Sequence, residues 1–335
     1  MTSQASASLA LPILDAELEG RLRQRLVEVE AELDATIQSE ARFVTEAARH
    51  LMHAGGKRFR PLLVLLAAET GDPEADGIVT AACVVELTHL ASLYHDDVMD
   101  EAALRRGADS ANARWDNLVA ILTGDFLFSK SSELTARLGA DAVRIQAETF
   151  TRLVEGQILE TLGPQDGADP LDHYLRVVAG KTGSLIATSA RYGARFAGAP
   201  SEVEEALTAY GEMIGSAFQL SDDILDIASD SEESGKTPGT DLREGVDTLP
   251  TLLARRSTDP GDARLLELLD ADLTDDTLHA ETLGLLRKHP AMDEARAYVL
   301  ERAAEARQRL TVLPEGSPVR AALDTFAEIV ATRTA

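Results

Sequence analysis

Hydrophobic residues recur at every third or fourth position along much of this 335-residue chain. The repeat is clearest in residues 15–54, where glutamate and arginine fill the positions between the hydrophobic residues. Such spacing is typical of an amphipathic helix, because 3.6 residues complete one turn and place the hydrophobic side chains on one face. We therefore expect one long helix or two in this segment. The hydrophobic positions of its buried face are Leu18, Leu22, Leu26, Val29, Leu33 and Ile37.

Similar patterns continue to the C-terminus, interrupted by short runs of glycine and proline that favour turns. Pro61 suits the first turn of a helix and is followed by a leucine-rich stretch. No segment shows the strict alternation of hydrophobic and polar residues that is typical of a strand. The expected fold class is therefore all-α. After the helix that starts near Pro61, the predicted helical segments are residues 74–104, 112–138, 141–162, 170–193, 200–228 and 246–333, the last with polar breaks at 258–261 and 313–318.

Two segments depart from this regular pattern. A lysine–threonine–glycine run at residues 181–183 interrupts the helix that is predicted over residues 170–193. Residues 229–245 are rich in Asp, Glu, Ser and Gly, and this composition predicts a mobile loop. We expect residues 1–14 to be a flexible N-terminus and residues 1–335 to form a single domain.

Composition limits the functional classes more than it limits the fold. Hydrophobic residues make up 44% of the chain, enough for a large core, and the net charge of -25 argues against nucleic acid or anionic membrane as partner. Cys83 is the single cysteine, so neither an intrachain disulfide nor a cysteine zinc site is expected. The N-terminus lacks the basic start of a signal peptide, and no run of about 18 apolar residues is found. A cytoplasmic protein without a membrane span is therefore expected.

Two acidic motifs follow apolar segments. The first places four acids within a few residues, and on a helix Asp96 would share a face with Asp100. Asp97 would likewise share a face with Glu101. Like charges repel by about 4 kcal/mol for a 4 Å pair at an effective dielectric of 20, so a cation is expected between them, and carboxylate oxygens suit Mg²⁺. Alone, the motif fits a solvated acidic helix end equally well, but the pattern recurs at Asp222, Asp223 and Asp226.

Basic residues lie near the boundaries of the predicted helices. Lys57 and Arg60 would be at a helix N-terminus, where the backbone N–H groups and the helix dipole favour an anion. Arg105 and Arg106 are expected to end the helix that carries the first motif, as in a metal-bridged phosphate site. Lys181 lies among small and apolar residues. Each of these is explained equally well by a solvated surface residue. Together with six motif carboxylates, they indicate two or three Mg²⁺ ions, a diphosphate group and a hydrocarbon remainder of the substrate.

The chain resembles the trans-isoprenyl diphosphate synthases of the polyprenyl synthetase family over nearly its full length. Each matching piece is weak alone, but all of them occur in the family order with family-like separations. They are GGKRFRP, ELTHLASLYHDDVMDEAALRRG, GDFLF, KTGSL, AFQLSDDILD and GKTPGTDLREG with the nearby DTLP. The resemblance implies an isoprenoid synthase-like fold, a single large helical bundle around a central cavity. It also implies Mg-dependent head-to-tail (1'-4) condensation of isopentenyl diphosphate with an allylic prenyl diphosphate, giving an all-trans polyprenyl diphosphate.

The resemblance further implies a role for each residue that matches a family motif. The direct Mg²⁺ ligands would be Asp96, Asp100 and Asp222. The carboxylates supporting the metals or their waters would be Asp97, Asp223, Asp226 and Asp241. The allylic diphosphate would be held by Arg105, Lys181 and Lys236, with Gln219 close to it. Isopentenyl diphosphate would be held by Lys57, Arg60, His89 and Arg106. The residues near the carbocation would be Thr182 and Gln219. No side-chain base is implied, because the released diphosphate would take the proton.

One residue departs from the family pattern. After Gly245 the family commonly has a lysine that faces the allylic diphosphate, whereas this chain has Val246. The missing cationic contact is expected to weaken binding of the allylic substrate or to mark a subfamily. By analogy with the family, the protein is expected to form a homodimer.

The length of the product is expected to depend on residues just before the first motif. In the family, bulky side chains four and five residues before that motif close the hydrocarbon tunnel. Here those positions are Ser92 and Ala91, with Thr88 one turn further down. Their small size predicts a deep tunnel and a long product of roughly C30 to C50. A large residue on a neighbouring helix would close the tunnel instead, with Tyr94 and Phe150 as candidates.

Other functional classes fit parts of the pattern. A terpene cyclase would ionise a prenyl diphosphate without condensing it, but the complete set of isopentenyl diphosphate residues argues against this class. A non-catalytic subunit of a heteromeric prenyltransferase would typically lack motif aspartates, and none is lost here. A di-iron bundle needs two Glu-x-x-His pairs, and Glu86–His89 is the only one. A short-chain synthase making geranyl, farnesyl or geranylgeranyl diphosphate stays the alternative to a long-chain enzyme.

Overall fold

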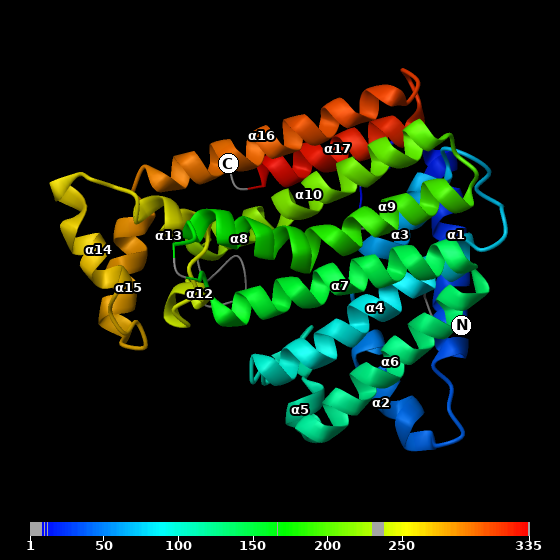
Figure 1. Ribbon diagram of the computed structural model, residues 1–335, viewed down its shortest axis with the longest axis horizontal. Coiled ribbons are helices and arrows are strands. Elements are labelled where there is room, and N and C mark those ends of the chain that lie inside the picture. Colours follow the sequence, from blue (N-terminus) through cyan, green and yellow to red (C-terminus); the bar gives the residue numbers. More distant parts are fainter. Residues whose placement is uncertain (1–8, 10, 12, 166, 230–237, 334–335) are drawn as a thin grey trace. The chain divides into compact units, whose positions relative to one another are not determined.

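Helices account for nearly all of the regular structure, which confirms the all-α prediction (Figure 1). The contacts of the chain group it into two compact units. The expectation of a single domain over residues 1–335 stays a prediction, and residues 1–8, 10 and 12 of the expected flexible N-terminus lie outside the described part of the chain. The computed structural model describes residues 9, 11, 13–165, 167–229 and 238–333.

Unit 1 comprises Met1–Phe150, Leu185–Gly211 and Leu310–Leu323. Its complete elements are α1 (Ala16–Thr36), α2 (Arg42–His53), α3 (Phe59–Ala68), α4 (Ile78–Met99), β1 (Leu104–Arg105), β2 (Ala108–Asp109), α5 (Ala111–Arg114), α6 (Asn117–Arg137) and the 3₁₀ turn η3 (Leu310–Val312). It also contains parts of α7 (Ala140–Leu162), α9 (Ser184–Phe196), α10 (Ser201–Ala228) and α17 (Pro318–Thr332).

The core of unit 1 is built around α4, which lies beside α6 (Figure 1). Apolar residues occupy most of α4 on all sides, as is typical of a helix that is buried in a core. A glycine also lets α9 approach α3 closely. A Cβ atom at Gly193 would lie 2.1 Å from the carbonyl oxygen of Val64, so any larger residue requires the helices to move.

By length and composition, α4 is also the one helix among the described residues that is apolar enough to cross a membrane. However, 67% of its most apolar window is buried inside the protein, and the core helix of a soluble protein has the same length and composition. The expectation of no membrane span therefore stays a prediction.

Unit 2 comprises Thr151–Ser184, Glu212–Arg309 and Asp324–Ala335. It contains the remaining parts of α7, α9, α10 and α17. Its complete elements are α8 (Pro170–Val178), the π-helical turn η1 (Ala179–Gly183), α12 (Thr240–Arg243), α13 (Leu249–Ala254), the 3₁₀ turn η2 (Pro260–Asp262), α14 (Ala263–Leu269), α15 (Asp276–Leu286) and α16 (Ala291–Arg309).

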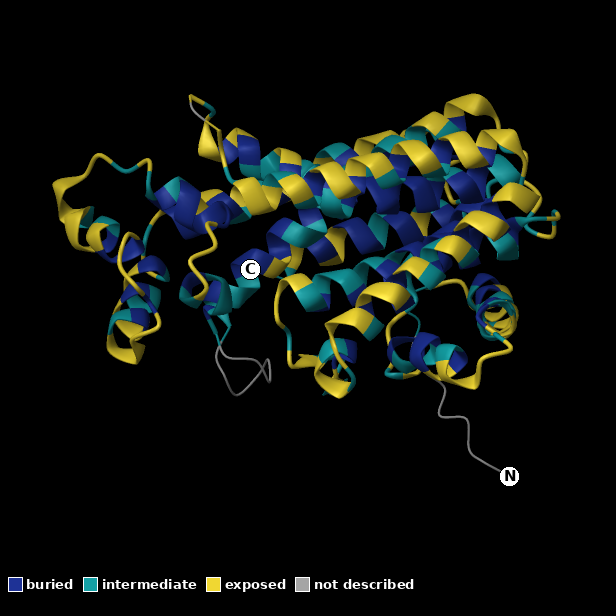
Figure 2. Cartoon of the chain, turned by 60° about the horizontal axis from the view of Figure 1, so that its bottom comes forward, coloured by how far each residue is buried: buried dark blue, intermediate teal, exposed yellow. Residues whose placement is uncertain are grey.

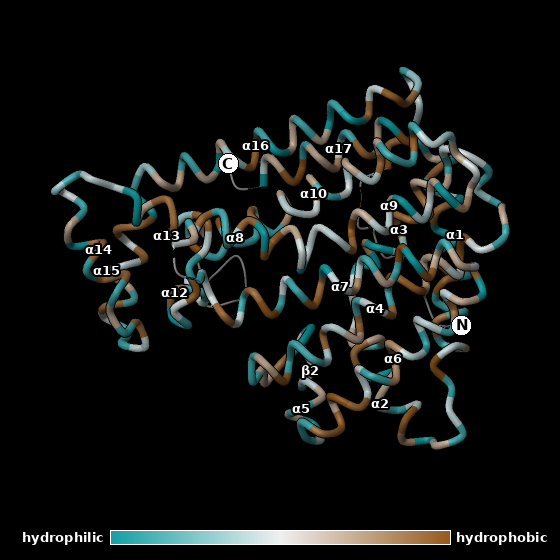
Figure 3. Tube along the Cα trace, in the orientation of Figure 1, coloured by the Kyte–Doolittle hydropathy of each residue, from teal (hydrophilic) through white to brown (hydrophobic). Residues whose placement is uncertain are grey.

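The longest complete helix of unit 2, α16, has the amphipathic pattern that the sequence predicts. Buried residues recur on one face while charged residues cover the other, and hydrophobic and hydrophilic stretches alternate along its trace (Figure 3). Buried and exposed residues also occupy opposite sides of other helices (Figure 2). The buried positions of α16 are Ala291, Met292, Ala295, Val299, Ala303 and Ala306.

The main correction concerns the end of the helix that was predicted over residues 74–104. It ends at Met99, and Glu101 has a left-handed backbone with a φ of 50°. Asp97 and Glu101 therefore do not share a helical face. Arg105 and Arg106 do not end the helix either, because they lie in a short antiparallel hairpin formed by β1 and β2. Two-residue strands are too short to show alternation, which explains why the sequence predicts no strand.

Other breaks agree with the sequence in part. The segment 15–54 forms two helices, one of the two arrangements expected, and the predicted interruption at 181–183 is present as a π-helical turn. Within the predicted loop at 229–245, Thr240–Arg243 forms α12, and residues 230–237 lie outside the described residues. The breaks that separate α14, α15 and α16 contain no strong glycine signal and were not predicted.

Candidate active site

The first acidic motif lies at the C-terminal end of α4 in unit 1. Asp97 is fully buried, and its Oδ1 accepts a hydrogen bond of 2.6 Å from Nε of Arg105. Its other oxygen, Oδ2, is buried and has no hydrogen-bond partner among the described residues. Burial raises the pKa of Asp97, although the contact with Arg105 opposes this effect. Asp100 is the exposed C-cap residue of α4, and Nη2 of Arg105 lies 3.9 Å from its Oδ2.

The hairpin places Arg106 beside the loop that precedes α3. Arg106 has a left-handed φ of 56°, and its Nη1 donates hydrogen bonds to the carbonyl oxygens of Leu51 and Gly55. A Cβ atom at Gly56 would lie 2.8 Å from the Arg106 guanidinium, and the φ of Gly56 is 127°. This position therefore favours glycine because of its backbone conformation, and a larger residue would also displace the Arg106 side chain.

A cluster of cations surrounds the buried carboxylate of Glu86 in unit 1. The Nη1 atom of Arg58 lies 3.2 Å from Oε1 of Glu86, whose exposed fraction is 2%. Burial lowers the pKa of Arg60 to about 10, and repulsion from Arg106 acts in the same direction. Burial also lowers the pKa of His89 well below its ordinary value, and the neighbouring arginines add to this effect. The cluster therefore combines arginine cations with a neutral imidazole.

Lys57 and Arg60 lie at the N-terminus of α3, as the sequence predicts. Lys57 is exposed and makes no hydrogen bond or ion pair within the described part of the chain. The Nε atom of Arg60 is buried and has no hydrogen-bond partner among the described residues. An unpaired guanidinium nitrogen in a cationic cluster fits an anionic ligand.

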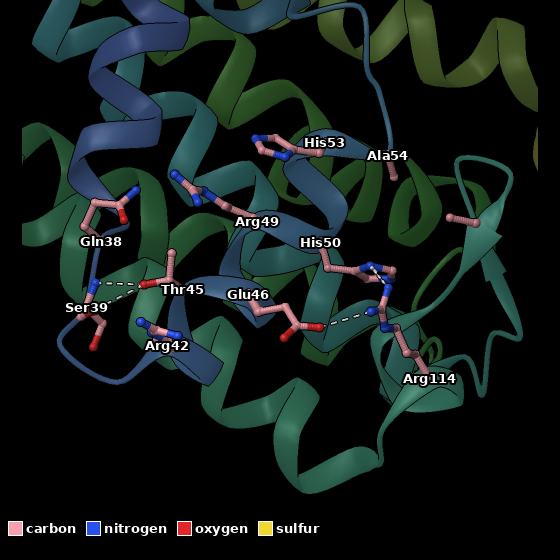
Figure 4. Close-up of a pocket in the computed structure, with 11 residues that line it drawn as sticks. Gln38, Ser39, Arg42, Thr45, Glu46, Arg49, His50, His53, Ala54 and Arg114 are labelled. Carbon is pink, nitrogen blue, oxygen red and sulfur yellow. Dashed lines mark hydrogen bonds and ion pairs between the residues drawn. The ribbon is translucent and has the colours of Figure 1, made fainter.

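A cavity of about 710 Å³ in unit 1 lies beside α2, and none of the predicted site residues lines it (Figure 4). Two of its cations already have carboxylate partners. Arg49 forms two hydrogen bonds with Asp34, and Arg114 lies 3.1 Å from Glu46. The Nε2 atom of His50 contacts the carbonyl oxygen of Asp109 at 2.6 Å. These contacts account for three of the basic residues of this cavity, Arg49, His50 and Arg114.

The second acidic motif borders a cavity of about 470 Å³ in unit 2. Asp223 is 6% exposed, and the Tyr174 hydroxyl donates a short hydrogen bond to its Oδ2. Nε2 of Gln219 donates to Oδ1 of Asp223 at 3.0 Å, and the Thr182 hydroxyl donates to Oε1 of Gln219 at 3.2 Å. Burial raises the pKa of Asp223 to about 6, which these hydrogen bonds oppose and the carboxylate of Asp222 reinforces.

The π-helical turn places Lys181 and Thr182 on the wall of the same cavity. A Cβ atom at Gly156 would lie 2.6 Å from the backbone nitrogen of Lys181, so glycine lets α7 approach this turn closely. The Lys181 ammonium forms an ion pair with Glu160 of α7. An irregular helical turn next to a cavity is a common feature of functional sites.

The rest of the second motif also has defined partners. The carboxylate of Asp226 accepts backbone N–H groups of Thr240 and Asp241, which ties α12 to α10. Asp222 is exposed, and its Oδ1 lies 2.9 Å from Nη2 of Arg333. Lys236, which was predicted to hold the allylic diphosphate, lies outside the described residues.

The residues present fit a hard divalent cation, although they do not form a closed protein cage. Among the described residues, no group of three or more His, Cys, Asp or Glu side chains is arranged to hold a metal ion by itself. Mg²⁺ usually binds through one or two carboxylates, together with water and substrate phosphates. The buried, unpartnered Oδ2 of Asp97 and the all-oxygen donor set of both motifs agree with that mode of binding.

Three residues of these sites were not predicted from the sequence. The sequence does contain a signal for Glu86, because it is the one acid in the first four turns of the apolar helix α4. Tyr174 and Arg333 had none, since their partners lie 49 and 112 residues away along the chain. Of the predicted residues, the structure brings Lys181, Thr182, Gln219, Asp223 and Asp241 together around the cavity of unit 2.

Comparison with known proteins identifies the class to which this fold and these sites belong. Residues 41–285 match the family described as Polyprenyl synthetase. The chain is 46% identical over 334 residues to nonaprenyl diphosphate synthase of Mycobacterium tuberculosis, covering 99% of each chain. The chain therefore belongs to the polyprenyl synthetase family, which confirms the resemblance, and it is a prenyltransferase.

Two solved structures agree with this assignment and differ in the product that their names imply. One is geranylgeranyl pyrophosphate synthase from Corynebacterium glutamicum, complexed with calcium and isoprenyl diphosphate (TM-score 0.87, 45% identity, covering 97% of this chain and 99% of that one). The other is decaprenyl diphosphate synthase from Rhodobacter capsulatus (TM-score 0.86, 34% identity, covering 95% and 99%). The isoprenoid synthase-like fold is thereby confirmed.

Proposed function

We propose that this protein condenses isopentenyl diphosphate with an allylic prenyl diphosphate in a Mg²⁺-dependent, head-to-tail (1'-4) reaction. The product is an all-trans polyprenyl diphosphate. The observation that carries the proposal is the cavity of unit 2, where Lys181, Thr182, Gln219 and Asp223 line one space. Family resemblance assigns these four residues to the allylic substrate and its metals.

The cationic cluster of unit 1 is suited to isopentenyl diphosphate. Arg60, Arg106 and His89 carry hydrogen-bond donors, and Lys57 adds an exposed ammonium group. The neutral His89 imidazole carries one N–H group, which donates a hydrogen bond to a phosphate oxygen without adding charge. Glu86 holds the Arg58 guanidinium, which keeps one cation of the cluster fixed while the substrate binds and leaves.

The residues of unit 2 hold the allylic diphosphate. Lys181 exchanges its partner Glu160 for a phosphate oxygen, and the family resemblance adds Arg105 to the residues that hold this diphosphate. The carboxylates of both motifs would hold two or three Mg²⁺ ions, and these ions would supply the positive charge that neutralises the leaving diphosphate. Val246 lies on the cavity wall and offers no charge there, so allylic binding relies on the remaining cations.

The reaction needs no side-chain base. The allylic C–O bond breaks and its electron pair leaves with diphosphate. The isopentenyl double bond then attacks the allylic cation, which forms the new C–C bond. Loss of one proton to the released diphosphate completes the product. The Thr182 hydroxyl donates to the Gln219 amide, and the family resemblance places these two dipoles near the carbocation, where their negative ends would stabilise it.

A long product, of roughly C30 to C50, is proposed from the small residues on α4. Ala91 and Thr88 are fully buried, whereas Ser92 is partly exposed. The Thr88 hydroxyl contacts Ser131 at 2.8 Å and accepts a hydrogen bond of 2.7 Å from Gln146. The latter two residues line a cavity of about 240 Å³ in unit 1, which provides space next to the small α4 residues.

A short-chain product is the second candidate, and an aromatic pair favours it. Phe150 lines the same cavity and packs against Phe128, with ring centroids 4.6 Å apart. Tyr94 is no longer a candidate for closing the tunnel. Its hydroxyl donates a short hydrogen bond to the carbonyl of Ala47 and accepts the N–H of Leu51, so the side chain is directed toward α2.

One pair of variants separates the two product lengths. Ala91→Phe introduces a ring at the position that the family resemblance assigns to closing the tunnel, and it is expected to shorten the product. Phe150→Ala removes a ring and is expected to lengthen the product only if the aromatic pair closes the tunnel. Chromatography of dephosphorylated products measures both effects. An unchanged product distribution in Ala91→Phe would refute the role of α4 in setting length.

A homodimer and a cytoplasmic location complete the proposal. Family resemblance supports the dimer, and α6 adds a physical reason. Leu118, Ile121 and Leu122 recur on one face of α6 and are exposed. A stripe of apolar residues on a helix is stabilised by burial against a second copy of the chain. Light scattering of the wild type and of Leu122→Glu tests this, since the variant should shift the protein toward monomer.

The activity itself is tested with isopentenyl diphosphate and allylic primers of 5, 10, 15 and 20 carbons, with and without Mg²⁺. Product formation that depends on both substrates and on the metal is the expected result. Failure of every primer in the presence of Mg²⁺ would contradict the proposal and favour a non-catalytic subunit of a heteromeric enzyme.

A further inference from the structure

Arg333 lies against the second acidic motif in unit 2. Its Nε donates a hydrogen bond of 2.7 Å to the Ser221 hydroxyl, and its Nη2 lies 2.9 Å from Oδ1 of Asp222. Its guanidinium carbon is 4.1 Å from the centre of the Phe218 ring. Its backbone N–H donates to the carbonyl of Ile329, which extends the last turn of α17. These contacts hold the guanidinium in one place.

The contact is less solvated than an ordinary surface ion pair. The exposed fractions of the Arg333 and Asp222 side chains are 22% and 46%. Solvent and salt therefore screen the attraction only in part. The planar guanidinium engages three acceptors on α10, namely the Phe218 carbonyl, the Ser221 hydroxyl and the Asp222 carboxylate. An isolated surface ion pair usually contributes little to stability, but here the ion pair is combined with hydrogen bonds and a ring contact.

The motif itself explains why a cation is favourable at this point. Asp222, Asp223 and Asp226 lie within five residues of each other, so each ionised carboxylate raises the cost of ionising the next. Asp226 is compensated by two backbone N–H groups of α12, which carry only partial charges. Arg333 supplies a full positive charge directly at Asp222.

The same charge opposes a metal ion at that carboxylate. A divalent cation that binds at Oδ1 of Asp222 must share this oxygen with the guanidinium or displace it, and like charges a few Å apart repel. We propose that Arg333 is the resident counter-cation of the second motif, stabilising Asp222 in the metal-free enzyme and lowering its affinity for Mg²⁺. The inference rests on the proposed function, which assigns Asp222 to the metal.

This arrangement links metal binding to substrate binding. Without substrate, the guanidinium keeps Mg²⁺ from occupying Asp222 at low metal concentration. A bound diphosphate adds negative charge and restores the balance in favour of the metal. Arg333 is a positioning residue, because it acts through Asp222.

The test compares three variants by calorimetric titration of the metal-free, full-length enzyme with MgCl₂. Arg333→Gln removes the charge, and Arg333→Lys keeps it. Arg307→Gln is the matched control, because it causes the same change in net charge at an exposed pair with Asp324 in the same unit. The expected result is about three- to tenfold tighter Mg²⁺ binding in Arg333→Gln. The Lys variant and the Arg307 control should stay within about twofold of the wild type.

A structural role alone would lower the melting temperature of the metal-free protein without changing Mg²⁺ affinity, so the titration separates the two. Weaker binding in Arg333→Gln, or an equal change in the Arg307 control, would overturn the inference. Titration needs no prenyl transfer, so an enzyme that makes no product would refute the proposed activity and leave the comparison of affinities valid. Absence of Mg²⁺ binding in the wild type would overturn the inference together with the metal requirement.

Discussion

Asp223→Asn should stabilise the metal-free protein above neutral pH while impairing its activity. Asp223 is 6% exposed, and its pKa of about 6 lies above the ordinary value of 3.8. A carboxyl group whose pKa is raised by folding reduces stability at pH values above the folded pKa. This cost disappears as the pH falls below 3.8, because both states then carry the proton.

The size of the effect follows from the same values. The difference between about 6 and 3.8 corresponds to about 3 kcal/mol at pH 8. An asparagine oxygen accepts one hydrogen bond, from Tyr174 or from Gln219, so the variant loses the other, at a cost of about 1.5 kcal/mol. The net gain is on the order of 1 to 2 kcal/mol at pH 8, or a few °C in melting temperature. At pH 4.5 most of the gain is lost.

Thermal denaturation with a chelator at the two pH values measures this prediction. The variant should melt higher than the wild type at pH 8 and no higher at pH 4.5. The matched control is Asp272→Asn, an exposed acid in unit 2 whose pKa is lowered by hydrogen bonds with Thr274, so its removal should not stabilise at pH 8. Equal destabilisation of Asp223→Asn at both pH values would refute the reasoning that burial strains this carboxylate.

Three further variants and one chemical reaction test the packing. Glu86→Gln should destabilise the protein by about 2 kcal/mol in chemical denaturation. This is less than is usual for a broken buried ion pair, because Arg58 keeps Glu30 as a partner. An unchanged denaturation midpoint would contradict this prediction. Gly193→Ala should destabilise by about 3 kcal/mol through its overlap with Val64, whereas Gly20→Ala, which meets no atom within 4 Å, should stabilise α1 by up to about 1 kcal/mol. Cys83 is buried and its pKa is raised, so it should react with a thiol reagent only after unfolding.

The sequence predicts the helices well where one face is polar. Residues 15–54 and α16 show a regular spacing of apolar residues, because each has one buried and one exposed side. The end of α4 was harder to predict. Its polar residues continue past Met99 into the hairpin, and the turn depends on left-handed backbone at Glu101 and Arg106 rather than on glycine or proline alone.

The sequence predicts the motif residues of the candidate site. It does not predict the residues that contact them. The aspartates and Lys181 lie in short local patterns whose chemistry is visible in the sequence. Tyr174 and Arg333 contact the second motif only because distant segments pack together, and nothing near either residue in the sequence indicates that contact. The π-helical turn is an intermediate case, since glycines mark a break without specifying its type.

The central claim is that both acidic motifs serve one condensation of isopentenyl diphosphate with an allylic diphosphate. The most direct test is the rate of product formation by the wild type, Asp96→Asn and Asp222→Asn, at saturating primer and Mg²⁺. The account predicts an elongated all-trans product from the wild type and a loss of at least about 100-fold in each variant. Product formation that survives either substitution, or no product from the wild type with any primer, would contradict it.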